Sequence, residues 1–300
     1  MNVAFLTCPG THPGSPTRRA DAFEHDLMVA AIRPELATRG HGLVEIDWRS
    51  PLEAFANMPL VLVGTPWDYQ DSEEQFLAKL EALEAAGHIL CNSAATVRWN
   101  VRKTYLRDLA ASGAATIPTL WIEAPTATDI AAAMEHFGTG SVVAKRQVGA
   151  GAEGQSIHHH ASLDTDWRMA HPAMLQPFLP QIQRDGEYSF LFVDGRFSHA
   201  LRKRAAAGDY RVQSIYGGTE ETLEPSPDDI ATAQAVVDAV PQGMPLYCRI
   251  DMVRGSDGTL LLMEAEMIEP FLYPEQGPQL GVLMAEAITR RLEALTPVTT

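Results

Sequence analysis

The sequence predicts an α/β protein with two or three domains. Its 300 residues suit that number at a usual domain size of about 100 to 200 residues. In the N-terminal third, short apolar strands alternate with helices, which is the order of a parallel sheet covered by helices. In the C-terminal half, two Asp-Gly dipeptides each separate two apolar runs, which is typical of antiparallel hairpins.

The amino-acid composition limits the kinds of molecule that the protein can bind. Hydrophobic residues make up 46% and charged residues 20% of the chain, as in ordinary globular proteins. The 38 Asp and Glu residues outnumber the 23 Lys and Arg residues, which gives a net charge of −15. Such a field repels nucleic acid and anionic membrane surfaces, so we expect neither as a partner. An anionic small ligand would need a local cluster of Lys and Arg.

The cysteines and the N-terminus predict a cytoplasmic protein. Cys8, Cys91 and Cys248 are odd in number and lie in apolar runs, as expected of buried free thiols in a reducing compartment. The N-terminus lacks the basic region of a signal peptide, and no apolar run approaches the length of a membrane span.

The N-terminal region carries a candidate substrate site. Ligands of parallel sheets collect beyond the carboxyl ends of the strands, which places residues 7–15 and 64–69 at that edge. Trp67, Asp68 and Tyr69 could hold a polar substrate there, or they could simply cover a domain edge. The expected elements are strands at Val3–Thr7, Leu43–Asp47, Leu60–Thr65 and His88–Cys91, a helix at Glu24–Arg39, and a helix opened by a capping box at Ser72–Gln75.

The remaining elements follow from the same periodicities. In the centre we expect helices at Arg98–Ser112 and Thr128–Phe137, and strands at Leu120–Ile122, Ser141–Lys145, Ser156–His160 and Met174–Phe178. Towards the C-terminus we expect a hairpin of Tyr188–Val193 with Arg196–Arg204, helices at Pro227–Val240 and Gln279–Leu292, and a second hairpin from Tyr247 to Pro270.

A glycine-rich loop lies between two of the central strands. Gly149, Gly151 and Gly154 match the dinucleotide-binding spacing, but the residues that follow are strand-like and offer no helix N-terminus to a pyrophosphate. The P-loop spacing also fails, because Gln155 stands where its lysine is required. We expect a flap between antiparallel strands that covers phosphates, with Lys145 supplying the charge. A plain hairpin loop is the alternative.

The hairpin from Tyr247 to Pro270 predicts a metal site. A two-residue turn at Asp257-Gly258 would place Asp251 opposite Glu264 and Arg249 opposite Glu266, all on one face of the ribbon. Three clustered carboxylates repel one another unless a cation lies among them, and hard oxygen donors suit Mg²⁺. The alternative is a solvated face with Arg249 neutralising one acid.

With these residues in view, the segment from Trp99 to Pro270 resembles the ATP-grasp superfamily. The metal hairpin resembles the R-x-D and E-x-N hairpin of D-alanine-D-alanine ligases and glutathione synthetase. Glu266 departs from the Asn of most members, although a carboxylate still binds Mg²⁺. Residues 66–69, 99–106 and 199–203 resemble a small branch that includes cycloserine-forming cyclo-ligases.

The resemblance implies roles for individual residues. Arg249, Lys203 and Arg204 would be the catalytic cations, and Asp251, Glu264 and Glu266 the metal ligands. ATP would be held by Lys103 and Lys145, by the lid of Gly149, Gly151 and Gly154, by the adenine hinge of Gln176, Phe178 and Leu179, and by Glu187 at the ribose.

It also implies an ATP-grasp fold and a ligase reaction. The γ-phosphoryl of ATP would pass to the carboxylate of a small amino-acid-like substrate, and the substrate's own nitrogen would then close a ring. An intermolecular carboxylate-amine ligase and a non-catalytic ATP-binding protein are the alternatives. The expected domains are 1–97, 98–179 and 180–300, the expected cofactors are ATP and two Mg²⁺ ions, which Mn²⁺ may replace, and the resemblance is compatible with a homodimer.

Overall fold

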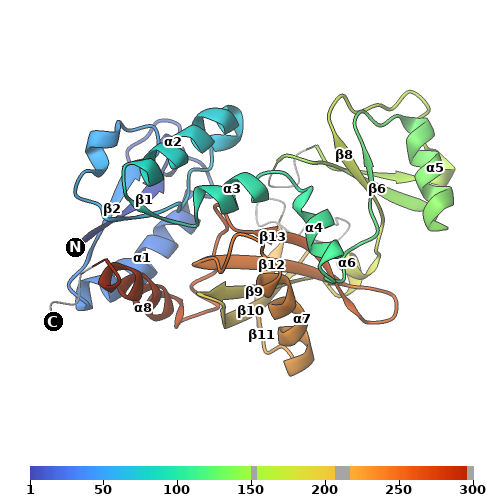
Figure 1. Cartoon of the computed structure of the whole chain (residues 1–300). Helices are drawn as coiled ribbons and strands as arrows, with labels where there is room; N and C mark the ends of the chain where they lie inside the picture. Colours follow the sequence, from blue (N-terminus) through green and yellow to red (C-terminus); the bar gives the residue numbers. More distant parts are fainter. Residues whose placement is uncertain (150–153, 207–216, 296–300) are drawn as a thin grey trace.

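The computed structural model describes residues 1–149, 154–206 and 217–295, and in these ranges the strands form three sheets. Figure 1 shows the N-terminal sheet with its helices on one side of the molecule and the small sheet of β6 and β8 on the other. The hairpin of β12 and β13 lies between them. No helix of the described ranges is long and apolar enough to span a bilayer. Cys8, Cys91 and Cys248 are buried free thiols, as expected.

The N-terminal sheet is parallel, as predicted. Its order is β2-β1-β3-β4, and alternate residues of β1 face opposite layers. Val3 and Phe5 pack in the core shared with α1, whereas Ala4 and Leu6 pack in the core shared with α2. The elements are β1 (Asn2–Thr7), β2 (Gly42–Asp47), β3 (Leu60–Leu62) and β4 (Ile89–Cys91), with helices α1 (Ala22–Thr38) and α2 (Glu73–Ala85) and 3-10 turns at Pro9–Thr11, Leu52–Phe55 and Tyr69–Ser72.

Two local predictions for this region were wrong. Strand β3 ends at Leu62, not Thr65, because Gly64 leaves the extended conformation: its φ is +66°, and a Cβ there would lie 2.5 Å from the carbonyl oxygen of Leu6. The Ser72 side chain makes no capping hydrogen bond, because Ser72 ends a 3-10 turn that leads directly into α2.

The C-terminal helix returns to the N-terminal sheet. Helix α8 (Leu280–Glu293) packs on α1, and Gly281 allows the close approach, since a Cβ there would lie 2.1 Å from the carbonyl oxygen of Ala31. The same core includes Leu191 and Leu201 of the large sheet. The first and last thirds of the chain are therefore joined by one continuous apolar core.

The small sheet is antiparallel and has the order β5-β8-β6-β7. Its apolar face is covered by the α5 residues Ile130, Ala133 and Met134. The glycine loop joins β6 to β7, and these strands are antiparallel, as the flap interpretation required. The elements are β5 (Leu120–Ile122), α5 (Ala127–Phe137), β6 (Ser141–Arg146), β7 (Ser156–His159), a 3-10 turn at His160–Ser162, and β8 (Ala173–Pro177).

The large sheet is also antiparallel, in the order β11-β10-β9-β12-β13. Phe190, Ile250 and other apolar side chains on one face pack against α7, while the opposite face carries charged residues. This division follows from the alternation of side chains along each strand. The elements are α6 (Gln181–Arg184), β9 (Glu187–Val193), β10 (Arg196–Arg204), β11 (Thr219–Leu223), α7 (Pro227–Asp238), β12 (Tyr247–Arg254) and β13 (Leu260–Glu266).

The helix predicted at Arg98–Ser112 is broken into α3 (Ala94–Asn100) and α4 (Tyr105–Ala111). Periodicity missed the break because its cause lies elsewhere in the chain. The backbone N–H of Lys103 donates to the carbonyl oxygen of Gln147 at 2.8 Å instead of continuing the helix. The break places Lys103 beside the glycine loop.

Side chains of this segment cover the outer edge of β13. Asn100 donates to the Ala265 carbonyl at 2.8 Å and accepts from the Met267 N–H at 2.9 Å. Asn92 donates to the carbonyls of Tyr247 and Met267, and the Tyr105 hydroxyl accepts from the Ala265 N–H at 3.0 Å. These side chains thus pair with backbone groups that an edge strand would otherwise leave free.

The two Asp-Gly dipeptides form different turns. Asp194 and Gly195 both have positive φ, so the first hairpin has the expected two-residue turn. At the second, only Gly258 has positive φ, and the Gly255 N–H donates to the Thr259 carbonyl across a three-residue loop. The two-residue turn predicted there is therefore wrong.

Candidate active site

The charged face of the large sheet gathers most of the predicted catalytic residues. Arg249 pairs with Glu266 and Asp251 pairs with Glu264, as predicted. The pairing survives the altered turn because a bulge between Asp251 and Met252 restores the expected register. All four side chains therefore project from one face of the β12–β13 ribbon.

Asp251 is the centre of this face and is only 3% exposed. It accepts hydrogen bonds from the Ser189 hydroxyl, from Arg249 Nε at 3.0 and 3.1 Å, and from Lys203 Nζ at 3.3 Å. Burial acts to raise the pKa of Asp251, but the charges of Arg249 and Lys203 outweigh it and leave the pKa below its ordinary value. Asp251 is thus held as a carboxylate.

Lys203 links Asp251 to a second buried acid. Its Nζ donates to Glu187 Oε1 at 2.8 Å, and Lys203 is 4% exposed. Burial raises the pKa of Glu187, although Lys203 counteracts it. Glu187, whose role at a ribose stays a prediction, forms an ion pair with Lys203.

Arg204 is not brought to this face. Neighbouring residues of a strand point to opposite sides, and Arg204 pairs with Glu221 at 3.1 Å and with the carbonyl of Arg184 at 3.3 Å. Both Lys203 and Arg204 were predicted to be catalytic, but the structure places only Lys203 on the charged face. The predicted catalytic role of Arg204 has no geometric support.

The outer carboxylates of the hairpin are paired with cations as well. Glu264 accepts from Lys103, and Glu266 accepts from Arg249 Nη2. Burial raises the pKa of Glu266 to about 7, with Arg249 opposing the shift and Glu264 and Asp251 adding to it. The negative charge at Glu266 is therefore incompletely balanced.

Lys145 lies at the end of β6, close enough to Glu264, Lys103 and Glu187 to interact with their charges. Burial lowers its pKa, and it makes no ion pair with another described residue. Lys145 thus contributes a positive charge that no carboxylate of the described residues contacts directly.

The predicted hinge follows the last strand of the small sheet. The backbone N–H of Phe178 donates to the Ser141 carbonyl at 2.9 Å, and Leu179 accepts from the Ile182 N–H at 3.1 Å. Gln176 is buried and donates to the Thr119 hydroxyl at 2.9 Å. In the lid, Gly149 and Gly154 have positive φ, whereas Gly151 lies outside the described residues.

The three candidate substrate residues of the N-terminal region lie in different surroundings. Trp67 reaches the hairpin, because its Nε1 donates to the Glu269 carbonyl at 3.1 Å. Tyr69 is buried against Phe76, with ring centroids 4.8 Å apart. Asp68 accepts from Trp48 Nε1 at 2.8 Å and from Arg49 at 2.6 Å, contacts that hold the N-terminal loops together.

Comparison with known proteins supports the resemblance. Residues 3–92 match the family described as D-cycloserine synthetase DcsG, N-terminal domain. The cycloserine biosynthesis protein DcsG of Streptomyces lavendulae is 28% identical over 268 residues, which cover 82% of this chain and 88% of that protein. The crystal structure of D-cycloserine synthetase DcsG superposes with a TM-score of 0.80 at 22% identity, over 97% of this chain and 100% of that one. The ATP-grasp ligase PsnB, in complex with its minimal precursor, gives a TM-score of 0.65 at 18% identity, over 96% and 99% of the two chains.

The chain has the ATP-grasp fold. The predicted fold class and the predicted similarity to DcsG are thereby confirmed.

The hairpin of this ATP-grasp chain offers suitable donors for a divalent metal. Three carboxylates share one face, and the raised pKa of Glu266 marks a place where positive charge is lacking. Across the described residues, no three acidic, His or Cys side chains are gathered as metal ligands, since each hairpin carboxylate is turned towards Lys103, Arg249 or Lys203. The residues fit Mg²⁺ by their oxygen donors and by their shared face of the ribbon.

Several residues of the site were not found from the sequence. Burial raises the pKa of Glu24 on α1 to about 7, and this carboxyl interacts with Arg249 and Lys203. Burial and Glu266 raise the pKa of Glu269 to about 8, while a hydrogen bond from Tyr69 acts in the opposite sense. Glu269 could have been found as the third acid after Glu264 and Glu266. Glu24 could not, because only tertiary packing brings α1 to the large sheet.

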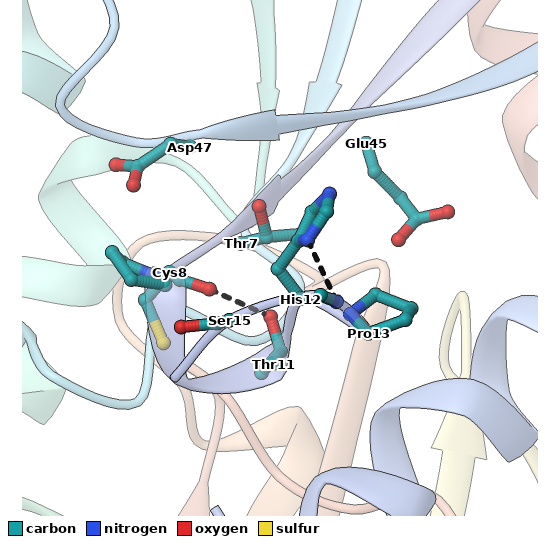
Figure 2. A pocket seen from close by; sticks show the side chains of 10 residues that line it. Thr7, Cys8, Thr11, His12, Pro13, Ser15, Glu45 and Asp47 are labelled. Carbon is teal, nitrogen blue, oxygen red and sulfur yellow. Dashed lines mark hydrogen bonds between the residues drawn. The ribbon is translucent and has the colours of Figure 1, made fainter. Parts of the chain in front are cut away.

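A cavity of about 570 Å³ lies beyond the carboxyl ends of β1 and β2 in the ATP-grasp chain's N-terminal region. Figure 2 shows His12, Glu45 and Asp47 among the residues that line it, and the Thr11 hydroxyl donates to the Cys8 carbonyl. This is the edge at which the sequence placed residues 7–15.

Proposed function

We propose that the protein is an ATP-dependent ligase that activates the carboxylate of a small amino-acid-like substrate and then closes a ring. The observation that carries this proposal is the similarity to the cycloserine biosynthesis protein DcsG over most of both chains. The alternation of acids and cations on the large sheet supports it, because phosphoryl transfer to a carboxylate requires positive charge around both anions.

The first step would transfer the γ-phosphoryl group of ATP to the substrate carboxylate. A carboxylate oxygen forms a new bond to phosphorus as the bond to the bridging oxygen of ADP breaks. Lys103 contacts Glu264, Lys203 contacts Glu187, and Lys145 interacts with the charges of both acids, so the three lysines would neutralise the phosphate charge. Asp251, Glu264 and Glu266 would hold Mg²⁺, which supplies further charge neutralisation at the phosphates when bound.

The second step would form the carbon–nitrogen bond. The substrate nitrogen attacks the acyl carbon, phosphate leaves, and the nitrogen loses a proton. Arg249 lies on the same face as the three carboxylates, where its guanidinium would stabilise the oxyanion of this step. When the nucleophile belongs to the same molecule, effective molarities of about 10⁵ M or more favour ring closure without a second amine site.

An intermolecular ligase is the second candidate, and one observation favours it. The cavity beside Glu45 and Asp47 offers room and acidic groups for a separate amine substrate. Activity would then require two substrates rather than one.

We also propose the finer features that the resemblance implies. These are functional units at 1–97, 98–179 and 180–300, two Mg²⁺ ions that Mn²⁺ can replace, a cytoplasmic location and a homodimer. ATP would lie between the second and third units, under the lid of Gly149–Gly154 and against the hinge of Gln176, Phe178 and Leu179. Trp67 and Tyr69, with Asp68 behind them, would border the substrate.

An ADP-release screen tests the proposal. O-substituted serines of both hands are supplied with ATP and Mg²⁺, alone and with free amino acids, and products are identified by mass spectrometry. We expect ADP and a small cyclic amide from one substrate without added amine. ADP that forms only with a second amine would favour the intermolecular ligase, and no ADP under any condition would favour a non-catalytic ATP-binding protein.

A further inference from the structure

Tyr273 has a backbone conformation that an aromatic residue rarely adopts. Its φ is +48°, and among the described non-glycine residues only Asp194 shares a positive φ. The value at Asp194 is required by its two-residue hairpin turn, but Tyr273 lies in the segment after the metal hairpin, outside any such turn. Strained residues of this kind persist only where the surrounding structure fixes them, and they concentrate at functional sites.

The surroundings of Tyr273 do fix it. Its carbonyl accepts from the N–H groups of both Gln276 and Gly277 at 3.1 Å. Arg249 Nη1 donates to the Phe271 carbonyl at 3.1 Å, which holds the start of the segment. The His199 ring packs so tightly that a Cβ on Gly277 would lie 2.1 Å from its Nδ1. The segment 271–277 is therefore tied to the charged face at both ends.

The backbone conformation of Tyr273 places its ring next to two cations. Tyr273 is 6% exposed, with Lys203 Nζ 5.3 Å and Arg249 Cζ 5.7 Å from the centroid of its ring. These cations repel each other, yet both donate to Asp251. The negative face of an aromatic ring attracts both without adding a charge. The Tyr273 hydroxyl makes no hydrogen bond to another described residue, so the ring face is the part in use.

We infer that Tyr273 is a positioning residue, whose ring face holds Lys203 and Arg249 side by side on Asp251 so that both cations face the reacting carboxyl group. The inference rests on the proposed function, in which these two cations act on the acyl phosphate. It assigns a part in the reaction to a residue that carries no charge and donates no proton.

Fluorination of the ring tests this role directly. Tyr273→Phe should keep kcat for ADP release within about twofold, since its ring face is retained. Each fluorine weakens the ring quadrupole with little change of size, so kcat should fall by about threefold per fluorine across mono-, di- and trifluorophenylalanine. The same analogues at Phe190, on the opposite face of β9, are the control and should leave kcat unchanged. A flat series at position 273, equal to that at position 190, would overturn the inference.

A second measurement does not depend on turnover. Tyr273→Leu and Lys203→Met, singly and together, form a double-mutant cycle on the free energy of unfolding. We expect the two losses to be non-additive, because the ring and the ammonium group interact. Additive losses would overturn the contact itself. Absence of ADP from the wild-type protein would instead refute the proposed function and leave this cycle to decide on Tyr273.

Discussion

Replacement of Lys203 by Met should destabilise the fold in a way that depends strongly on pH. Lys203 is the cation that contacts both Glu187 and Asp251. Without it, Asp251 keeps Arg249 and the Ser189 hydroxyl, but the Glu187 carboxylate loses the one side-chain hydrogen bond that it makes with a described residue. A buried carboxylate left without a cation takes up a proton instead.

The size of the effect follows from that proton. A carboxyl group has an ordinary pKa of about 4.3, so pH 7 lies about 2.7 units above that pKa. Protonating the carboxyl at pH 7 therefore costs the folded state about 3.7 kcal/mol. At pH 5 the same step costs about 1 kcal/mol. Because the folded-state pKa of Glu187 is raised in the variant, its destabilisation is largest at neutral pH and fades as the pH falls towards the unfolded-state value. Because burial already raises the pKa of Glu187 in the wild type, the wild type has part of the same pH dependence, and the loss relative to it should be smaller at pH 5 than at pH 7 by at most about 2.7 kcal/mol.

Urea unfolding of both proteins at the two pH values measures this difference. Adding Glu187→Gln to Lys203→Met should remove most of the pH dependence, because the acid that takes up the proton is gone. Lys79→Met is a control, since Lys79 donates to the Ser50 carbonyl, and its loss of up to about 1.5 kcal/mol should be equal at both pH values. Equal losses for Lys203→Met at pH 5 and 7, or a pH dependence that survives Glu187→Gln, would refute the reasoning.

Three further predictions concern the metal hairpin, the lid and the segment after the hairpin. Asp251→Asn or Glu264→Gln should lower ADP release at least about 100-fold, since metal charge at the phosphates is worth several kcal/mol. The circular dichroism spectrum should be unchanged. Normal ADP production by both variants would show that the hairpin takes no part in the mechanism. Lys145→Ala should weaken ATP binding in calorimetry much more than substrate binding, and unchanged ATP affinity would make Lys145 a simple strand-end residue. Gly277→Ala should destabilise the protein by about 1–3 kcal/mol through overpacking against the His199 ring, and a melting temperature equal to that of wild type would show that the ring moves aside freely.

The order of elements could be predicted from local patterns. The apolar run of Val3–Thr7 and the glycines that end helices depend only on neighbouring residues, so most strands and helices were expected in the observed order. Strand β11 (Thr219–Leu223) was not expected. The pairing of Asp251 with Glu264 was expected for a partly mistaken reason. The assumed turn was one residue too short, and a bulge in β13, where Met263 is the extra residue, cancelled the error.

The remaining features depend on contacts between distant segments. The break at Lys103 is caused by the Gln147 carbonyl, which no periodicity within residues 98–112 can report. Glu24 reaches the site only because α1 packs against the large sheet. Arg204 shows the converse: its place in a basic run suggested a ligand-binding role, whereas strand alternation turns it to the other face.

The amide side chains on the edge of β13 have a consequence for how the hairpin can change. An amide that both donates to one carbonyl and accepts from a neighbouring N–H, as Asn100 does at Ala265 and Met267, matches the strand in one alignment only. A slip by one residue would present the wrong backbone groups to Asn100 and would turn Glu264 and Glu266 to the apolar side. The segment that carries Lys103 therefore fixes the alignment of the strand that carries the carboxylates. Insertions or deletions in the turn at Gly255–Thr259 should in consequence be absorbed within the turn itself, which leaves its length free to vary while the acids stay in place.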